Sequence, residues 1–415
     1  MHETDYDIAI VGGGMVGISL ALALGQMTPA PRVVLIEAQD YSKQLPPSFD
    51  SRTIALSYSS RQIFDALHLW QALVAQGVTP IQTIHISDRG HAGITHLQAS
   101  EQQVEALGYV IENRILGQVL YQALQAMTQV HVLASAELQA MSLGSEVAEL
   151  RGVQQGKPLD IRAKLVVAAD GTQSFVRQYL GVAQRHWDYR QSAVIANVAC
   201  DQPHKNIAYE RFTSTGPMAL LPLSALADTP HRYGLVWTVP TVQTDAVLQL
   251  SDTEFAARLR RLFGSRAGKF IRIGQRHAYP LGHTQIQEHV RQRLAFIGNA
   301  AHTLHPVAGQ GFNLGLRDVA ALAQVIREAL INDRDPGELQ ALQAYARWRR
   351  RDLIQTSLFT DSLVRVFSTD FLPLVVARNV GLFAMECFAP LRKRLTRHAM
   401  GYVGRASLLA RGLGL

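Results

Sequence analysis

A glycine-rich turn near the N-terminus constrains the fold more than any other feature of this chain. Gly12, Gly14 and Gly17 match the pattern G-x-G-x-x-G and directly follow a short apolar run, residues 6–11. Residues 12–27 have a helical composition, and residues 32–37 form a second apolar run of strand length. Strand, glycine turn, helix and strand together predict a βαβ unit, and therefore a parallel α/β domain.

The residue types in this unit favour a dinucleotide ligand. Gly12 permits a tight turn, Gly14 lets a diphosphate approach the backbone, and Gly17 lets the helix pack closely on the strand. The start of the helix offers N–H groups to the phosphates. Glu37 ends the second strand, where its carboxylate would accept hydrogen bonds from ribose hydroxyls. An acid here fits an unphosphorylated ribose, hence FAD or NAD rather than NADP, whereas an ordinary βα turn is the alternative.

Two more glycine-bearing segments follow strand-like runs later in the chain. Asp170-Gly171 comes after residues 165–169, and such a pair is by itself most often a turn. Gly298-Asn299 follows residues 293–297, and Pro306 and further glycines then precede a long helical pattern. Free N–H groups at the start of that helix would hold electron density on a flavin ring, although an ordinary glycine-rich loop has the same composition.

The apolar pattern predicts two domains and a helical end. Strand-like runs dominate residues 181–279, with one helical stretch at 253–262, and long helical patterns cover 311–330 and 339–366. We therefore expect a Rossmann-like α/β domain with an inserted, mainly antiparallel β-sheet domain. The expected ranges are 1–75, 105–180 and 280–365 for the cofactor domain, 76–104 and 181–279 for the substrate domain, and 366–415 for a helical, basic C-terminal segment. Locally, we expect one helix over 59–75, a helix capped by Asn113, and a pair of strands over 133–150.

Charge and cysteine content exclude several functional classes. The net charge is +7, and six Lys or Arg but no acid lie between Phe388 and the C-terminus. This distribution is not the chain-wide basic face of a nucleic-acid-binding protein. Cys200 and Cys387 are the only cysteines and form no C-x-x-C pair, which argues against a disulfide scaffold or a zinc site. No signal-peptide pattern is present, so we expect a cytoplasmic protein.

The three glycine motifs resemble those of the group A flavoprotein monooxygenases, the p-hydroxybenzoate hydroxylase-like family, in the same order and at similar separations over about residues 5–365. The resemblance implies a non-covalent FAD and a Rossmann-like FAD-binding domain. It places Gly12, Gly14, Gly17 and Glu37 at the ADP half, Arg52 near the diphosphate and Asn113 at the flavin. It also implies that Asp170 serves both FAD and the nicotinamide donor, that Asn299 meets the ribityl chain, and that Pro306, Gly311, Phe312 and Asn313 lie by the isoalloxazine.

One position departs from the family pattern, because Asn299 stands where the family has an aspartate. An amide oxygen still accepts a hydrogen bond from a ribityl hydroxyl, but without the help of a negative charge. We therefore expect somewhat looser FAD binding, and not its loss.

Within the family, four stretches are most similar to the ubiquinone-pathway hydroxylases, above all those that act on 2-polyprenyl-6-methoxyphenol. These stretches are residues 87–93, 194–198, 210–212 and 309–318. The implied reaction is ring hydroxylation through a flavin hydroperoxide, with O₂ and with NAD(P)H or another electron donor. A sister hydroxylase with another aromatic substrate, and a flavin-bearing scaffold of a biosynthetic complex, remain as alternatives.

The remaining candidates are less specific. His302 and His305 are weak candidates for a proton relay near the flavin loop, with packing or capping as the alternative, and H-x-x-H without further ligands predicts no metal. Apolar residues between Leu391 and Leu409 recur at helical spacing among arginines. This pattern fits peripheral contact with an anionic membrane, and equally a helix docked on the protein itself or on a partner of a ubiquinone-biosynthesis complex.

Overall fold

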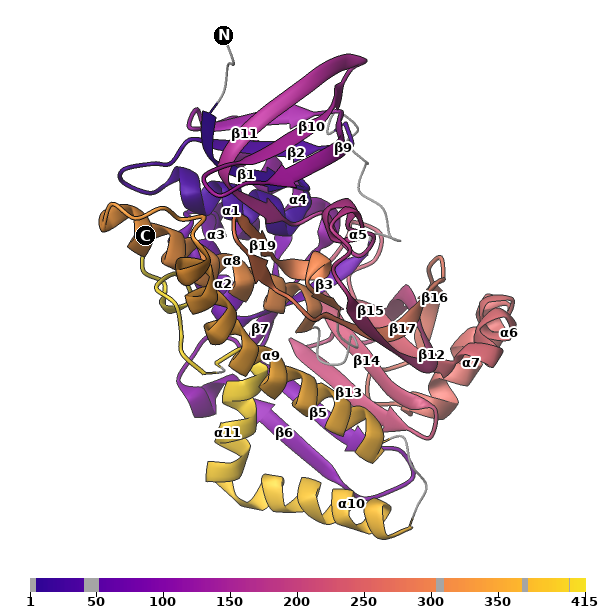
Figure 1. Ribbon diagram of the computed structural model, residues 1–415. Helices are drawn as coiled ribbons and strands as arrows, with labels where there is room; N and C mark the ends of the chain where they lie inside the picture. Colours follow the sequence, from indigo (N-terminus) through magenta and orange to yellow (C-terminus); the bar gives the residue numbers. More distant parts are fainter. Residues whose placement is uncertain (1–4, 41–51, 304–309, 368–371, 403) are drawn as a thin grey trace.

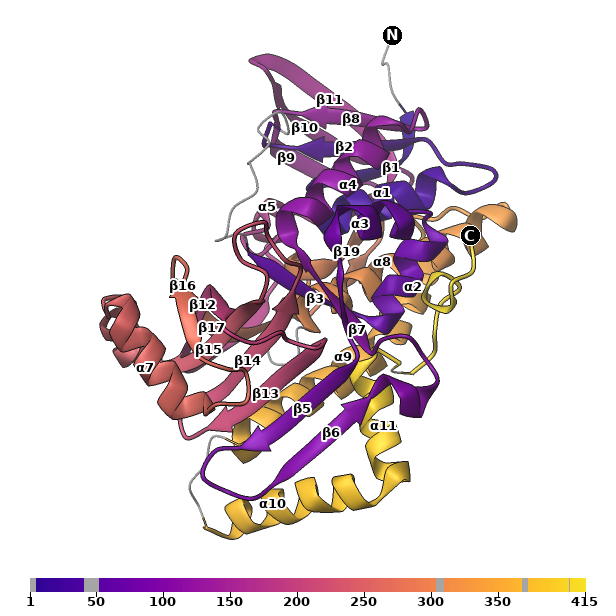
Figure 2. The ribbon, with the colours of Figure 1, turned by 180° about the vertical axis from the view of Figure 1, so that it is seen from behind.

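The computed structural model describes residues 5–40, 52–303, 310–367, 372–402 and 404–415. Two large sheets lie one beyond the other, and the C-terminal helices run from the first sheet to the far edge of the second (Figure 1, Figure 2). The fold is therefore the predicted α/β architecture with a second, mainly antiparallel sheet.

The first sheet is built around parallel strands in the order β19-β11-β1-β2-β8, with β18 at the edge and a β9–β10 hairpin added to β11. Its strands are β1 (Asp5–Val11), β2 (Val33–Glu37), β8 (Val130–Ala134), β9 (Ala136–Leu143), β10 (Ala148–Gln154), β11 (Lys157–Ala168), β18 (Val290–Arg291) and β19 (Leu294–Phe296). Helix α1 (Met15–Gly25) packs between α4 (Asn113–Gln125) and α8 (Gln310–Ile331). Every residue of α1 from Gly17 onward is buried, as the apolar composition of this helix requires.

The second sheet has the order β20-β17-β12-β15-β14-β13-β5-β6, with β16 also paired to β12, and its neighbours are antiparallel except β13 and β5. Its strands are β5 (Thr83–Asp88), β6 (Ile94–Gln98), β12 (Gln184–Cys200), β13 (Ile207–Thr213), β14 (Gly216–Leu223), β15 (Arg232–Pro240), β16 (Phe270–Ile273), β17 (His277–Ile286) and β20 (His302–Thr303). Helix α7 (Asp252–Phe263) covers one face, where Trp237 packs on Phe255. The other face is the floor of a cavity.

Smaller elements connect the two sheets. A three-stranded sheet joins β3 (Thr53–Ser57), β7 (Gly108–Glu112) and β4 (Thr79–Ile81). The short helices are α2 (Tyr58–Ala66), α3 (Trp70–Gly77), α5 (Phe175–Tyr179), α6 (Thr244–Leu248), η1 (Ala99–Gln102), η2 (Thr241–Gln243), η3 (Gly298–Ala300) and η5 (Leu409–Arg411).

Three helices dominate the C-terminal part. They are α9 (Leu339–Phe367), α10 (Leu372–Cys387) and α11 (Ala389–Ala399). Helix α10 lies along β6, at the end of the molecule opposite to the first sheet in both views (Figure 1, Figure 2). The predicted helical C-terminus is thus confirmed.

Two local predictions are wrong, each for a visible reason. The single helix over 59–75 is two helices, because His68 adopts φ +59° and the chain turns there so that Leu67 and Leu69 both reach the core. Asn113 does not cap α4 but is its first residue, with Glu112 in the capping position. The expected strand pair over 133–150 is confirmed as the antiparallel pair β9–β10, and Ser135 (φ +53°) separates β9 from the end of β8.

The helical spacing between Leu391 and Leu409 does not correspond to one helix. Helix α11 ends at Ala399, and Gly401 and Gly404 follow with φ +85° and +65°. Backbone at these angles ends an α-helix and favours glycine.

Candidate active site

The three glycine motifs meet at the carboxyl ends of three neighbouring parallel strands. Ala169 N donates to Val11 O at 2.8 Å, and Ile297 N donates to Ala168 O at 3.0 Å, so β1, β11 and β19 end side by side. Each motif begins directly after one of these ends. In open α/β sheets this edge is where ligands bind.

Close backbone approaches hold the motifs together and explain the glycines. Gly12 has φ +104°, and a Cβ on Gly17 would lie 1.9 Å from the carbonyl oxygen of Gly12. Val16, on the first turn of α1, packs against both Gly298 and Gly315, where an added Cβ would lie 3.1 and 2.9 Å from its methyl groups. Larger side chains at these glycines would push the first and third motifs apart.

The first motif leaves space on its outer side. Among the described residues, a Cβ on Gly14 would meet nothing within 4 Å, and no side chain caps the start of α1. Glu37 lies beside this opening, with its carboxylate accepting hydrogen bonds from Gly13 N at 2.6 Å and Gln39 N at 2.7 Å. An open helix N-terminus beside a fixed carboxylate is the arrangement that a diphosphate and a ribose require.

The two carboxylate oxygens of Asp170, in the second motif, have different surroundings. Its Oδ2 accepts from Val176 N at 3.1 Å, whereas its Oδ1 is buried without a hydrogen-bond partner among the described residues. Burial raises the pKa of this carboxyl above its usual value. Arg177, seven residues further on, donates to Ala300 O at 3.1 Å and so ties the second motif to the third.

Asn113 and Arg52 have different surroundings. The Oδ1 of Asn113 is also buried without a partner within the described part of the chain. Such an orphaned oxygen fits a donor on a bound ligand. Arg52 is exposed, and its guanidinium donates to the hydroxyl of Tyr279 in β17 at 3.1 Å.

Residues at the start of α8 line a cavity and also fix the helix to β3. Gly311, Phe312 and Asn313 all line the cavity described below. The side chain of Asn313, however, accepts from Ser57 N at 2.8 Å and donates to Ala55 O at 2.9 Å, and therefore fixes α8 to β3. Its side-chain amide thus acts as a positioning group. Pro306 and His305 lie outside the described residues.

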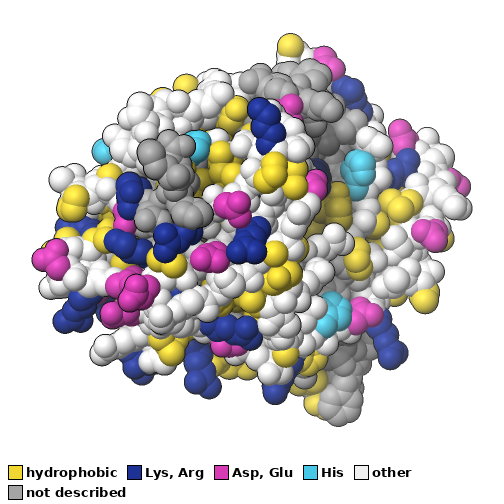
Figure 3. Space-filling model, turned by 45° about the horizontal axis from the view of Figure 1, so that its top comes forward, with side chains coloured by type: hydrophobic (Ala, Val, Ile, Leu, Met, Phe, Trp, Pro, Cys, Tyr) yellow, Lys and Arg dark blue, Asp and Glu magenta, His cyan; other side chains and the backbone are white. Residues whose placement is uncertain are grey.

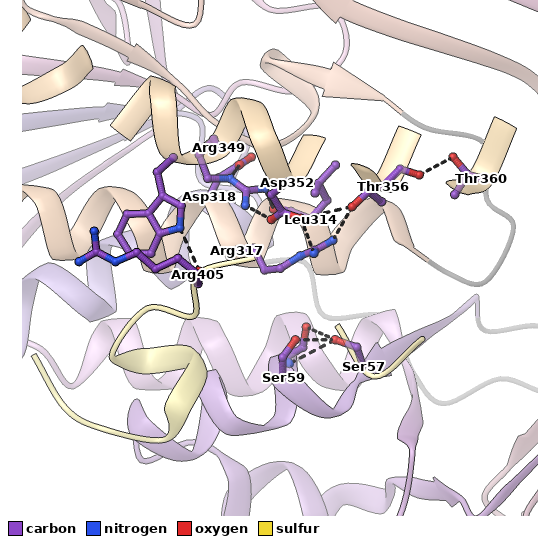
Figure 4. Close-up of polar contacts among 12 residues, drawn as sticks. Ser57, Ser59, Leu314, Arg317, Asp318, Arg349, Asp352, Thr356, Thr360 and Arg405 are labelled. Atoms are coloured by element: carbon purple, nitrogen blue, oxygen red, sulfur yellow. Dashed lines mark hydrogen bonds and ion pairs between the residues drawn. The ribbon is translucent and has the colours of Figure 1, made fainter. Parts of the chain in front are cut away.

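His302 is part of a buried ionic network beneath the third motif. Its Nε2 lies 2.7 Å from Asp318 Oδ2, which also accepts from Gly298 N at 2.9 Å. Arg349 donates to Asp318 Oδ1 at 2.6 Å and also pairs with Asp352 (Figure 4). Burial opposes ionisation of Asp318, but His302, Arg349 and the Gly298 hydrogen bond hold its pKa well below the usual range. This bonding makes His302 a support for the Gly298 turn.

A large apolar cavity joins the motifs to the second sheet and the C-terminal helices. Its volume is about 920 Å³, and it is lined near the motifs by Gly14, Gly298, Asn299 and Phe312. Alternate residues of the second sheet form its floor, and four side chains close the far end, namely Leu382 and Met385 of α10 and Leu395 and Ala399 of α11.

Glu210 is the one acidic side chain that lines this cavity among the described residues. It lies in a cross-strand row with Ile86, Ala219 and Val236, all of them apolar cavity residues. Burial raises the pKa of Glu210 to about 8. Sequence reasoning missed this residue, although a signal was present: Glu210 alternates with Ala208 and Phe212 and therefore shares their apolar face.

The site fits FAD. The space beside Gly14, the carboxylate of Glu37 and the Oδ1 of Asp170, which has no partner among the described residues, match a diphosphate, a ribose and a hydroxyl donor, respectively. The cavity beyond them is continuous and apolar, as an isoalloxazine and an aromatic substrate require.

Comparison with known proteins agrees with this geometry. A family model described as "FAD binding domain" matches residues 5–357. The ubiquinone hydroxylase UbiL of Rhodospirillum rubrum is 37% identical over 397 residues, covering 95% of this chain and 89% of that protein. The chain is an FAD-dependent aromatic monooxygenase of the ubiquinone-hydroxylase family.

Other members of this family match over nearly their whole length. The 3-demethoxyubiquinol 3-hydroxylase of Escherichia coli is 34% identical, with 97% of this chain and 100% of that protein covered. The fold also matches the crystal structure of p-nitrophenol 4-monooxygenase PnpA from Pseudomonas putida, with a TM-score of 0.78 at 18% identity, covering 97% of this chain and 99% of that one. The predicted family, fold class and cofactor are thereby confirmed.

Proposed function

We propose that this monooxygenase hydroxylates the ring of a polyprenylated methoxyphenol in ubiquinone biosynthesis. The observation that carries the proposal is the apolar cavity, which runs from the flavin-binding motifs to α10 and α11. A phenol ring at the motif end leaves the far end, lined by Leu382 and Leu395, for the polyprenyl tail. The names of the relatives, a ubiquinone hydroxylase and a 3-demethoxyubiquinol 3-hydroxylase, support this substrate class.

The residues proposed to hold FAD are drawn from those expected from the sequence. Gly12, Gly14 and Gly17 would receive the diphosphate at the start of α1, and Glu37 the ribose. Asp170, Asn113 and Asn299 would meet the remaining polar groups, with the backbone of Gly311 and Phe312 at the ring system. NAD(P)H is our proposed electron donor.

When bound, FAD supplies the activation of O₂ and the transfer of one oxygen atom to the ring. The chain itself must bind and orient the phenol, keep water away, and manage the phenolic proton. We assign this last task to Glu210, because it is the acid of the cavity floor. A carboxylate whose pKa is about 8 is a better proton acceptor for a phenol, with a reference pKa of about 10, than an exposed glutamate.

Two alternatives differ in substrate or in activity. A sister reaction on another ring of the same pathway, such as the one named for the Escherichia coli relative, would use the same cavity. A flavin-bearing scaffold with little turnover would not need an acid in an apolar floor, so Glu210 favours catalysis.

The test is a mass-spectrometric profile of lipid extracts from aerobically grown cells that lack the gene. Accumulated polyprenyl-methoxyphenol with little ubiquinone is the expected result. Accumulation of a different ring intermediate would move the chain to a sister step, and unchanged ubiquinone would overturn the assignment to this pathway.

A further inference from the structure

The charged side chains of helix α10 bond to the protein, while several of its apolar side chains are exposed. The helix carries two charged residues, and both bond to the β5–β6 hairpin: Arg378 donates to Asp88 at 2.8 Å, and Glu386 accepts from His96 N at 2.9 Å. Leu382 packs inward and lines the cavity. The inner face of α10 therefore packs against the rest of the protein.

The outer face of α10 is apolar and exposed. Val376, Val380 and Phe383 recur at helical spacing with 54%, 61% and 67% of their surface accessible, and Phe388 follows with 65%. On a helix that faces water, these positions are normally polar or charged. By contrast, basic and acidic side chains are interspersed on the face that bears the first sheet (Figure 3). The exposed row on α10 thus indicates a contact with an apolar medium.

The neighbouring charges are basic. Helix α11 presents Lys393, Arg394 and Arg397 to solvent, whereas its Arg392 is paired with Glu101. Apolar residues next to exposed lysine and arginine are the combination that binds the interface of a bilayer with anionic lipids. Among the described residues no single helix is long and apolar enough to cross a membrane, and the α10–α11 pair bends by 100°.

We propose that α10 and the start of α11 lie flat on the surface of an anionic lipid bilayer. Val376, Val380, Phe383 and Phe388 enter the boundary between headgroups and acyl chains, and Lys393 and Arg394 contact the headgroups. Because Leu382 and Met385 of the same helix line the cavity, one helix diameter, roughly 10 Å, separates the cavity from the lipid. A membrane-dissolved substrate then reaches the site past α10, and this part of the inference rests on the proposed function.

The experiment uses the FAD-loaded full chain and flotation with vesicles of phosphatidylethanolamine and phosphatidylglycerol. The double variant Val380→Glu/Phe383→Glu is compared with Val242→Glu/Ile271→Glu, which places the same charge on exposed apolar sites of η2 and β16, away from α10. We expect the vesicle partition coefficient to fall at least about tenfold in the first variant and to stay unchanged in the second. Lys393→Glu/Arg394→Glu should weaken binding to these vesicles but not the residual binding to phosphatidylcholine vesicles.

Three results would overturn the proposal: wild-type protein that does not float, equal flotation of both double variants, or a wild-type dimer that Val380→Glu/Phe383→Glu converts to monomer without any vesicle binding. The last result would assign the face to a second copy of the chain. Turnover of a water-soluble short-chain methoxyphenol separates the two proposals. Unchanged turnover in Val380→Glu/Phe383→Glu is expected, and wild-type flotation without any such turnover would contradict only the proposed function.

Discussion

The carboxylate of Asp318 lies 2.7 Å from Nε2 of His302 and at the same time receives the backbone N–H of Gly298. These contacts fix the turn at the end of β19 to α8. Arg349 of α9 bonds to the other oxygen of Asp318, so the first turn of the third motif depends on charges that are fully enclosed by protein.

Replacing Asp318 by Asn should therefore destabilise the chain strongly. The amide still accepts from Gly298, but Arg349 loses one of its two buried anions, and breaking such a pair costs about 3–5 kcal/mol. The pKa of Asp318 is lowered in the folded chain, so its contribution is present at neutral pH and is lost only as the pH falls below its unfolded value, about 4. Urea denaturation at pH 7 and at pH 5 should show the same deficit.

Asp160→Asn is the matched control, because this aspartate is 74% exposed and its pairing is worth little. We expect it to change the free energy of unfolding by less than about 0.5 kcal/mol. Asp318→Asn with wild-type stability would show that the network does not support the fold.

Substitutions at Gly14 and at Gly17 should have different effects, the first on FAD binding and the second on folding. Gly14→Trp places its side chain where no other described residue lies within 4 Å of the new Cβ, so the protein should fold but lose FAD, measured by flavin absorbance of the purified chain. Gly17→Val should instead prevent folding, because its Cβ would lie 1.9 Å from the Gly12 carbonyl oxygen. Normal ubiquinone levels in cells that carry only Gly14→Trp would support the scaffold alternative and contradict a catalytic role.

Glu210→Gln should slow ring hydroxylation by about 10²- to 10⁴-fold, the usual contribution of a general base. Wild-type kcat/KM should rise with pH through an ionisation near 8, and the variant should lose this rise. Glu210→Asp, which keeps the acid, should recover part of the rate. A pH profile of Glu210→Gln that still contains the ionisation would exclude Glu210 as its source.

Glu210→Gln should also stabilise the protein at alkaline pH. The pKa of Glu210 is raised by burial to about 8, so the folded chain binds a proton that the unfolded chain releases above about pH 4.5. Stability is therefore lost as the pH rises through this window, and Glu210→Gln should avoid the loss. We expect a gain of up to about 4 kcal/mol at pH 8 and little change at pH 4. Equal pH dependence of melting for both proteins would contradict the raised pKa of Glu210.

The far end of the cavity should select for the polyprenyl tail. Ala399→Phe narrows this end without touching the glycine motifs, so KM should rise at least about tenfold for a polyprenylated phenol and stay unchanged for the same ring without a tail. Leu413→Phe, an exposed change near the C-terminus, is the control. Equal effects on both substrates would mean that the tail does not occupy this end.

The architecture could be predicted from the sequence because glycine spacing and apolar runs are local patterns, formed by residues that are neighbours in the chain. The βαβ unit, the strands of the second sheet and the helix at 253–262 all have a local pattern, and the structure confirms them. The turn at His68 has no such signal, because it depends on which side chains the core accepts.

The site could be predicted only in part for a related reason. Glycine motifs that follow strands can be recognised from the sequence alone. The raised pKa of Glu210 and the ionic contacts of Asp318, by contrast, depend on elements distant in the chain. The outward apolar row of α10 was present in the sequence, but its exposure depends on Arg378 turning inward to Asp88.

Ring hydroxylation by this chain is tested most simply by incubating the purified, FAD-loaded protein with NAD(P)H, a polyprenylated methoxyphenol and isotope-labelled dioxygen, followed by mass spectrometry of the product. We predict one labelled oxygen atom in the ring product, and none when the label is supplied as water. Oxidation of NAD(P)H without labelled product, for this phenol and for related ring intermediates, would contradict the account.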